Sequence, residues 1–319
     1  MVVHPHFHAR YTGATRHVET VVPALNGALE ARVMGTLRDT SLPRIGWSAL
    51  LRRGGPIVWH AHRVNELLVG LALRLFKRKL RVVWTRHSTG KPAWLTSFLA
   101  RRADRVISVS PEAAETLGLP STVIGHGVDT KRFTTGERAW SPLGLGGDYG
   151  IGVIGRVRPD KGQGDFAEAV RPLLPHHPKW RAVLVGLVKP AERAWAEGLG
   201  LHLAGESPDV ERWYRGLTVV VMPSHHESFG LVRLEAMAAG CCLVTTKLNA
   251  MDRMIEHGKT GFTYEAGNVD QLRAILSELL ANPQRAHEVG AAGADLVRRE
   301  LGVDKEARAL LELYRSLSG

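Results

Sequence analysis

Cysteine is almost absent from this chain. Its two cysteines, Cys241 and Cys242, are adjacent in the sequence, and neighbouring cysteines make a poor disulfide because their sulfur atoms rarely reach the required geometry. No set of Cys and His residues follows the spacing of a structural zinc site. We therefore expect free thiols, no structural zinc and a reducing, cytoplasmic setting.

Long apolar runs are also missing. No segment reaches the ~20 apolar residues that a helix needs to span a bilayer, and residues 1–7 lack the basic-then-apolar pattern of a secretory signal. We expect any contact with an anionic membrane to be peripheral, at the inner face of the cell membrane. Residues 67–81 are apolar and then basic. They fit a helix lying on an anionic leaflet or, as we favour, a core helix with a solvated basic end.

Acidic residues are fewer than basic ones. The chain has 31 aspartates and glutamates and 42 lysines and arginines, which gives a net charge of +11. Such an excess indicates an anionic partner, which is nucleic acid, anionic lipid or a phosphorylated substrate. A nucleic-acid-binding module interleaves basic residues with exposed aromatics or carries a known docking element. Aromatics are only 6% of this chain and no such element occurs, so we expect no nucleic acid. The oligomeric state stays open.

Strand and helix patterns alternate along the 319 residues. This alternation is typical of parallel strands joined by helical crossovers, and the length fits two domains of about 100–200 residues each. Residues 137–149 are rich in glycine and weakly patterned, which predicts a linker. We therefore expect an α/β protein with two Rossmann-like, doubly wound parallel-sheet domains, 1–140 and 148–304, facing across a cleft, and a last helix in 305–319.

Individual elements follow from the same patterns. The expected strands are residues 57–59, 81–85, 105–109, 151–155, 182–186, 218–222 and 242–245. The expected helices are residues 65–76, 94–102, 164–174, 231–239, 269–281, 286–300 and 305–318.

The most informative stretch is residues 223–240, PSHHESFGLVRLEAMAAG. Glu227 lies in a loop after an apolar strand, and a helix opens at Phe229, Gly230 and Leu231. A helix start offers unpaired N–H groups and the positive end of the dipole, which suit a diphosphate, and Gly230 lets the backbone approach closely. A carboxylate can accept two hydroxyl hydrogen bonds. We predict that Glu227 reaches a sugar and that Glu235, two turns into the helix, reaches a ribose.

A second stretch, residues 155–162 (GRVRPDKG), follows the expected strand 151–155. It places a guanidinium, Arg156, and an ammonium, Lys161, at the carboxyl end of a parallel strand, where they suit two phosphates. Residues 88–91 (STGK) lack the glycine spacing of a phosphate loop, and we discount them.

Histidines alternate at two places, His4 with His6 and His8, and His60 with His62. Alternate residues of a strand share one face, so a metal site is conceivable. No acidic motif accompanies either set, and we therefore predict no metal.

Together, GR-V-x-x-x-KG and E-SFGLVRL-E resemble the family-four retaining glycosyltransferases of the GT-B fold, along nearly the whole chain. Residues 2–19, 106–111 and 123–133 are similar to first-domain segments of that family, with His126 where asparagine is usual. The chain is short for the family, and the shortening falls in the first domain. In the family the last helix often crosses back to the first domain.

The resemblance implies a role for each matching residue. Arg156 and Lys161 would hold the diphosphate and stabilise its departing charge, Glu227 would bind the donor sugar, and Glu235 the ribose. Other donor contacts would come from Thr12 and Gly13 under the phosphates and from the N–H groups of Phe229, Gly230 and Leu231. His87 resembles a histidine near the reacting carbon, with Arg86 and Ser88 as alternatives. Basic residues that suit an anionic acceptor are Arg10, Arg16, Arg63 and Lys91.

The activity implied is transfer of a hexose from a nucleotide-diphosphate sugar with retention and without a metal cofactor. Segments ARYTGATRHVE and HAHRVNELL are similar to bacterial lipopolysaccharide-core mannosyltransferases, so we expect GDP-mannose as donor and a glycan or glycolipid such as lipopolysaccharide core as acceptor. The alternatives are a UDP-hexose donor, another GT-B nucleotide-sugar enzyme such as an epimerase or phosphorylase, a non-catalytic homologue, or a basic nucleic-acid-binding protein.

Overall fold

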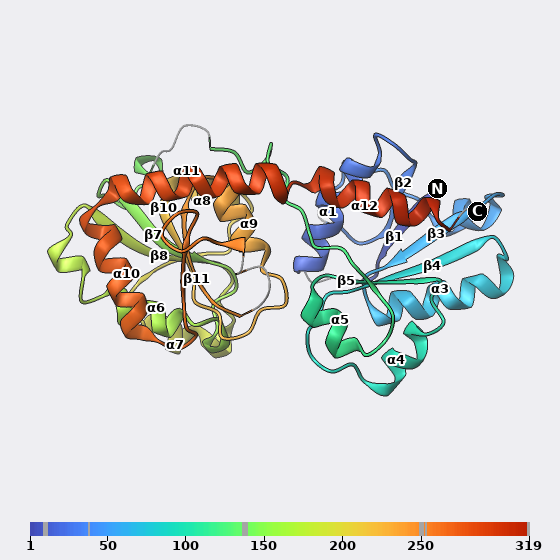
Figure 1. Cartoon of the computed structure of the whole chain (residues 1–319), viewed down its shortest axis with the longest axis horizontal. Helices are drawn as coiled ribbons and strands as arrows, with labels where there is room; N and C mark the ends of the chain where they lie inside the picture. Colours follow the sequence, from blue (N-terminus) through green and yellow to red (C-terminus); the bar gives the residue numbers. More distant parts are fainter. Residues whose placement is uncertain (9–11, 38, 136–139, 249–251, 253, 318–319) are drawn as a thin grey trace. The chain divides into compact units, whose positions relative to one another are not determined.

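The computed structural model describes residues 1–8, 12–37, 39–135, 140–248, 252 and 254–317. The chain divides into two compact units (Figure 1). Unit 1 comprises Met1–Gly127 and Gly302–Gly319, and unit 2 comprises Val128–Leu301. Each unit has its own six-stranded sheet, in which neighbouring strands of the described residues pair in parallel. The α/β class and the doubly wound parallel sheets expected from the sequence are confirmed.

Unit 1 has the strand order β2-β1-β3-β4-β5-β6. Its strands are β1 (Val2–His6), β2 (Ala31–Gly35), β3 (Ile57–Ala61), β4 (Leu80–Arg86), β5 (Arg105–Ser108) and β6 (Thr122–Val123). Its helices are α1 (Gly13–Leu25), α2 (Trp47–Arg52), α3 (Val64–Phe76), α4 (Trp94–Ala100), α5 (Pro111–Leu117) and α12 (Val303–Arg315).

Alternation along the strands divides the unit 1 core into two layers. Val2, Val58 and Val83 pack with α1 and α12 on one face of the sheet. Their neighbours Val3, Trp59 and Trp84 pack on the other face, with residues of α3 and α4. Helix α12 thereby joins the core of unit 1 although it is the last element of the chain (Figure 1).

Unit 2 has the strand order β12-β11-β10-β7-β8-β9. Its strands are β7 (Tyr149–Ile154), β8 (Trp180–Val185), β9 (His202–Gly205), β10 (Leu217–Met222), β11 (Cys242–Thr246) and β12 (Phe262–Tyr264). Its α-helices are α6 (Gln163–Val170), α7 (Arg193–Gly198), α8 (Val210–Gly216), α9 (Leu231–Ala238), α10 (Val269–Ala281) and α11 (Pro283–Glu300). Short 3-10 turns are Ser141–Leu143, Pro159–Lys161, Leu174–His176 and Pro190–Glu192.

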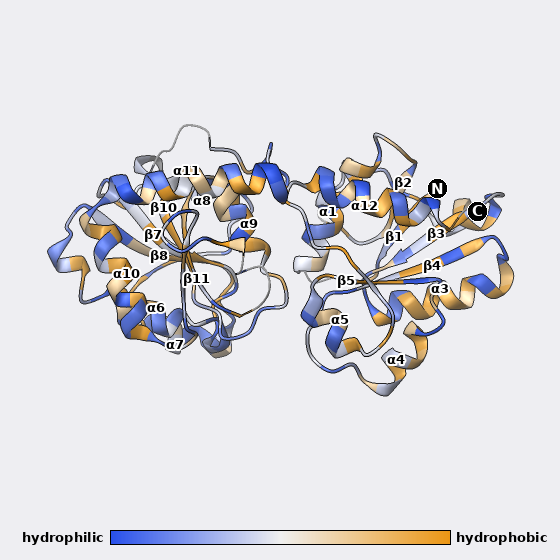
Figure 2. Cartoon of the chain, viewed as in Figure 1, coloured by the Kyte–Doolittle hydropathy of each residue, from blue (hydrophilic) through white to orange (hydrophobic). Residues whose placement is uncertain are grey.

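The apolar residues concentrate on the strands and on the inward sides of the helices (Figure 2). Both cysteines are buried and neither forms a disulfide; the Cys241 thiol donates to the carbonyl of Tyr214 at 3.1 Å. Within the described ranges, no helix combines the length and the apolar character needed to cross a bilayer.

Candidate functional site

In unit 2 the two predicted motifs form adjacent loops at the carboxyl ends of β7 and β10. Gly162 has a φ of 70°, and a Cβ atom built on it would lie 1.9 Å from the carbonyl oxygen of Pro223. His225 also donates its backbone N–H to the carbonyl of Asp160 at 3.3 Å. Only glycine, which has no Cβ atom, allows this close approach. The loops of residues 155–162 and 223–240 therefore lie against each other and form one surface.

Lys161 and Glu227 meet on that surface. Lys161 Nζ donates to Glu227 Oε2 at 2.8 Å, and the two side chains are 26% and 21% exposed. A partly exposed ammonium and carboxylate in contact can each exchange the other for a ligand group of opposite charge or for a hydroxyl. The structure thus brings together the predicted phosphate-binding cation and the predicted sugar-binding carboxylate.

Arg156 lies in the same loop but turns to another partner. Its Nη2 atom is 3.6 Å from Glu192 Oε1, and its side chain is 37% exposed. Its backbone carbonyl accepts a hydrogen bond from Gln163 Nε2 at 3.1 Å, which anchors the loop to the start of α6. The guanidinium is therefore available on a fixed backbone.

The start of α9 is the third part of this site. Phe229 is buried, Gly230 is the N-cap residue with a φ of 79°, and Leu231 is the first helical residue. A Cβ atom on Gly230 would lie 3.0 Å from Glu227 Cγ, so the helix begins directly beside the carboxylate. The backbone N–H groups of this first turn lie where a helix is most electropositive.

Glu235, the predicted ribose ligand, lies deeper. It is 3% exposed, and its Oε2 atom accepts a hydrogen bond from the hydroxyl of Tyr214 at 2.7 Å. Tyr214 in turn packs edge-on against Phe133. The ribose contact predicted for Glu235 stays a prediction.

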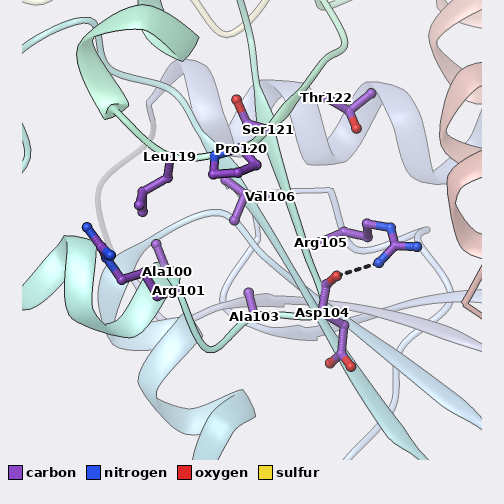
Figure 3. A pocket seen from close by; sticks show the side chains of 10 residues that line it. All are labelled: Ala100, Arg101, Ala103, Asp104, Arg105, Val106, Leu119, Pro120, Ser121 and Thr122. Atoms are coloured by element: carbon purple, nitrogen blue, oxygen red, sulfur yellow. Dashed lines mark hydrogen bonds between the residues drawn. The ribbon is translucent and has the colours of Figure 1, made fainter.

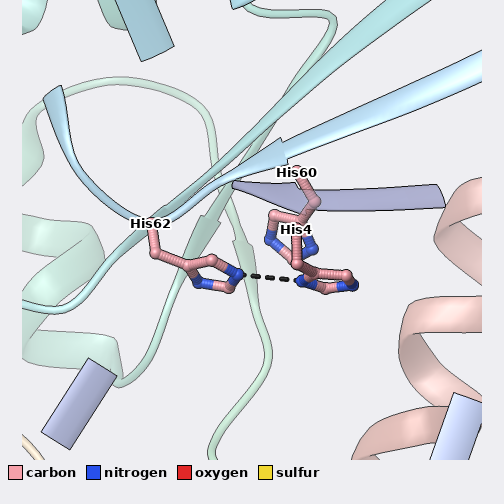
Figure 4. Close-up of side chains that lie close together, drawn as sticks. All are labelled: His4, His60 and His62. Atoms are coloured by element: carbon pink, nitrogen blue, oxygen red, sulfur yellow. Dashed lines mark hydrogen bonds between the residues drawn. The ribbon is translucent and has the colours of Figure 1, made fainter. Parts of the chain in front are cut away.

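In unit 1 the polar side chains at the carboxyl end of the sheet form what we call the histidine cluster. Its members come from β1, α1, β3 and the segments after β3, β4 and β6: His4, His17, His60, His62, His87 and His126. His4 Nδ1 lies 3.0 Å from His62 Nε2, and Figure 4 shows these two rings together with His60. The strand alternation noticed in the sequence therefore does bring histidines of β1 and β3 together.

Contacts between ring nitrogens continue from His62 through His87 and His126 to the carboxylate of Glu306. His62 Nδ1 lies 3.1 Å from His87 Nε2, and His87 Nδ1 lies 3.1 Å from His126 Nε2. Glu306, from α12, accepts from His17 Nε2 at 2.6 Å and from the backbone N–H of Gly127 at 2.8 Å. His126 Nδ1 is 3.4 Å from the same carboxylate.

Burial dominates the electrostatics of this cluster. It lowers the pKa of His4 to about 3 and that of His126 to about 4, and it places the pKa values of His60, His62 and His87 well below the ordinary value. Burial alone would raise the pKa of Glu306, but the charge of His17 and the hydrogen bonds from His126 and His17 outweigh it and lower that pKa. The lowered pKa values keep the rings of His4, His60, His62, His87 and His126 neutral at neutral pH, and Glu306 beside them is ionised.

Of the other predicted residues of unit 1, Thr12, Gly13 and Arg63 lie together at the start of α1. Thr12 caps α1, Gly13 is its first residue, and Arg63 Nη2 donates to Thr12 Oγ1 at 2.8 Å. Arg16 lies in the first turn of α1, and Lys91 is exposed in the loop after β4. Arg10 lies outside the described residues. The donor and acceptor contacts assigned to these residues stay predictions, as does that of His87.

A pocket of about 520 Å³ lies at the opposite edge of the unit 1 sheet (Figure 3). It is lined by Asp104, which precedes β5, by Arg105 at the start of β5, and by residues 119–122, which lead into β6. Ligands of open α/β sheets bind at the carboxyl ends of the strands, and this pocket is at the amino ends. It does not belong to the candidate site.

Sequence reasoning missed His17 and Glu306. His17 lies within residues 2–19, which drew notice only as a segment similar to the family's first domain, and Glu306 lies 289 positions further along the chain. His126 was noticed only as a departure from asparagine. No local spacing could have joined these three residues, because their contact depends on the packing of α1 against α12.

Family models match both parts of the chain. Residues 148–282 match "Glycosyl transferases group 1", and residues 35–132 match "Glycosyltransferase Family 4". The lipopolysaccharide core biosynthesis mannosyltransferase LpcC of Rhizobium leguminosarum bv. viciae is 33% identical over 100% of this chain and 97% of its own length. This chain is a family 4 (group 1) glycosyltransferase.

Further relatives agree with this assignment. The lipopolysaccharide core biosynthesis mannosyltransferase LpsB of Rhizobium meliloti (strain 1021) is 32% identical over 99% of this glycosyltransferase and 97% of its own length. Among solved structures, Anabaena Alr3699/HepE in complex with UDP and glucose superimposes with a TM-score of 0.83, at 19% identity and with 99% of each chain covered. That likeness confirms the expected GT-B fold.

Proposed function

We propose that this glycosyltransferase moves mannose from GDP-mannose to a lipopolysaccharide-core acceptor, with retention of the anomeric configuration. One observation carries the proposal: two lipopolysaccharide core mannosyltransferases match nearly the whole chain at 33% and 32% identity. The partly exposed Lys161–Glu227 pair beside the start of α9 supplies the chemistry that such a donor needs.

In the proposed donor complex the Lys161–Glu227 pair separates. The ammonium of Lys161 moves to the pyrophosphate, and the carboxylate of Glu227 accepts hydrogen bonds from sugar hydroxyls. Arg156 and the N–H groups of Phe229, Gly230 and Leu231 add positive potential where the leaving group gains charge, and Glu235 binds the ribose. These cations make a divalent metal unnecessary at the leaving group.

The proposed transfer takes place on one face of the sugar. The bond between the anomeric carbon and the phosphate oxygen breaks, the acceptor oxygen forms its bond to the same carbon, and the acceptor proton passes to the departing phosphate oxygen. A covalent sugar intermediate on a protein carboxylate is the alternative route to retention. Arg16, Arg63, Lys91 and Arg10 are proposed to attract an anionic acceptor.

The experiment that tests this proposal compares donors. GDP-mannose and UDP-glucose are offered separately with a purified lipopolysaccharide-core acceptor, and the product is identified by mass spectrometry and by NMR of its anomeric proton. We expect a retained α-linked mannose product from GDP-mannose alone. A product formed only from UDP-glucose, or an inverted linkage, contradicts the proposal. A thermal-shift series with GDP and UDP gives an independent measure of base preference.

From the sequence we favoured a core helix for residues 67–81, but the end of α3 is exposed. We therefore also propose that unit 1 rests on an anionic membrane through the outer sides of α3 and α4. Large apolar side chains are exposed there: Leu75 (79%), Phe76 (84%) and Trp94 (78%). Figure 2 shows apolar residues along both helices. Exposed basic residues lie beside them, including Arg78, Lys79, Arg101 and Arg102. Apolar side chains with a basic rim suit anionic headgroups, which is where a glycolipid acceptor resides.

A further inference from the structure

Three members of the histidine cluster face one another with one nitrogen each. Ring nitrogens of His17, His62 and His87 all lie within 4.8 Å of one another. The three residues come from different elements: His17 from α1, His62 from the residue after β3, and His87 from the residue after β4. The sequence led us to expect no metal, but His17 and His87 belong to neither of the alternating sets considered there. We propose that this trio binds one divalent transition-metal ion, with Zn²⁺ as the best match, because imidazole is a preferred zinc ligand.

The spacing of the nitrogens suits such an ion. His62 Nδ1 and His87 Nε2 are 3.1 Å apart. Two ligand nitrogens on a tetrahedral zinc lie about 3.3 Å apart, because each Zn–N bond is about 2.0–2.1 Å long. A shift of a few tenths of an ångström would therefore convert this contact into two bonds to one ion.

The second nitrogen of each ligand is already held. His17 Nε2 donates to Glu306 Oε1 at 2.6 Å. His62 Nε2 contacts His4 Nδ1, and His87 Nδ1 contacts His126 Nε2. Histidines that bind metals characteristically use their second ring nitrogen in this way, often towards a carboxylate, which orients the ring. Here a carboxylate and two further histidines fill that outer layer.

His17 supplies an independent observation. Its Nδ1 atom is buried and finds no hydrogen-bond partner among the described residues, while the ring as a whole is 3% exposed. An unsatisfied buried nitrogen carries a desolvation cost. A metal ion at the trio would bond to this nitrogen and remove that cost. His87 is only partly buried, which leaves a route of entry for the ion.

Two other groups of three side chains in the cluster could each offer a ligand atom per residue, but they fit a metal ion less well. In the group of His4, His60 and His62, both nitrogens of His60 are already hydrogen-bonded, to the hydroxyl of Tyr314 at 2.5 Å and that of Thr85 at 2.6 Å.

In the group of His17, His126 and Glu306, the 2.6 Å between His17 Nε2 and Glu306 Oε1 is a hydrogen-bond distance. It is shorter than the spacing of two ligands on one ion. The proposed ion binds to unit 1 alone, and its test does not depend on which donor the enzyme uses.

The test measures metal binding by the full-length, tag-free protein. After treatment with a chelator and dialysis, Zn²⁺ uptake is counted by mass spectrometry of the metal, and Co²⁺ is added as a spectroscopic probe. We expect one equivalent of Zn²⁺ and a visible Co²⁺ band typical of nitrogen ligands in low coordination. His17→Ala and His62→Gln should abolish both, and Glu306→Gln should weaken Zn²⁺ binding about 10–100-fold.

Two controls make the result specific. His176→Ala removes an exposed histidine of unit 2 and should leave uptake unchanged. His60→Ala should retain the ion, and circular dichroism checks that every variant is folded. Failure of the unaltered protein to bind either ion overturns the proposal. Undiminished binding by folded His17→Ala, or loss in His60→Ala with retention in His17→Ala, overturns it as well.

Discussion

At the carboxyl end of the unit 1 sheet the polar side chains are buried and bonded to one another, whereas at the same end of the unit 2 sheet they are ionic and partly exposed. Glu306 in unit 1 is 5% exposed and is bonded to His17 and to the Gly127 backbone. Glu227 in unit 2 has a side chain that is 21% exposed and pairs with Lys161. A buried carboxylate stabilises the fold that surrounds it, and a partly exposed one can give up its partner for a ligand.

The largest effect that would sharpen this comparison is expected from Glu227→Ala. Loss of the carboxylate should lower kcat by about 10²–10³-fold, as removal of one preorganised stabilising group does. Binding of the nucleotide diphosphate and the melting temperature should hardly change. Steady-state kinetics and calorimetric binding of GDP measure both. Glu256→Ala, which removes an exposed carboxylate of the same unit, is the control. Equal loss of turnover and GDP binding would refute the sugar role.

The next effect is expected in unit 1, on stability. Glu306→Gln removes a buried carboxylate that accepts hydrogen bonds from His17 and from the Gly127 backbone, so the free energy of unfolding should fall by about 3 kcal/mol. Urea unfolding followed by circular dichroism measures the loss. Glu312→Gln, on the exposed side of the same helix, should have an effect below about 0.5 kcal/mol. If Glu306→Gln and Glu312→Gln lower the free energy of unfolding equally, the buried carboxylate does not stabilise unit 1, and the comparison between the units fails.

A smaller effect is expected from Lys161→Ala. Loss of one charge-assisted contact should weaken GDP binding about tenfold to a hundredfold, while stability changes little because the Lys161–Glu227 pair is partly exposed. Isothermal titration with GDP measures the affinity, and Lys259→Ala, an exposed lysine of the same unit, serves as control. Undiminished GDP affinity would remove the assignment of Lys161 to the leaving group.

The smallest effect concerns the surface of unit 1. The pair Phe76→Ala and Trp94→Ala should lower partitioning onto vesicles of anionic phospholipid about tenfold, because each removes exposed apolar area that a bilayer would bury. Co-sedimentation measures it. Leu187→Ala removes a 44% exposed leucine of unit 2 and should have no effect. Equal partitioning of all variants would show that α3 and α4 are not the membrane contact.

Strong local patterns predicted most of the secondary structure. Helix α10 begins and ends where its pattern predicts, because Asn268 caps it by accepting from the N–H of Gln271 and a stripe of leucines faces the core. Strands β4, β8 and β10 agree within two residues at each end, since runs of valine and leucine mark them. Strands β2, β6, β9 and β12 were not predicted, and neither were helices α1, α2, α5, α7 and α8. The four strands have two to five residues each and are held by their neighbours in the sheet.

The site in unit 2 could be predicted from local sequence motifs, whereas the histidine cluster of unit 1 could be predicted only in part. Lys161 and Glu227 could be named from the sequence because each lies within a short motif directly after a strand, although their 2.8 Å contact could not. For the histidine cluster, strand alternation indicated His4, His60 and His62, but no acid lay near them in the sequence. Glu306 reaches His17 from α12, at the far end of the chain.

By itself the sequence determined the alternating elements, the two parallel sheets and the two motifs for which we propose sugar-nucleotide binding, because each depends on residues close together along the chain. Only the tertiary structure decided which polar groups are buried and which partners they have. Packing of α12 onto α1 brings the Glu306 carboxylate to His17 and His126, which sequence spacing leaves far from it. Burial, which no local pattern measures, lowers the pKa values of the other buried rings, those of His4, His60, His62 and His87, and that of His126.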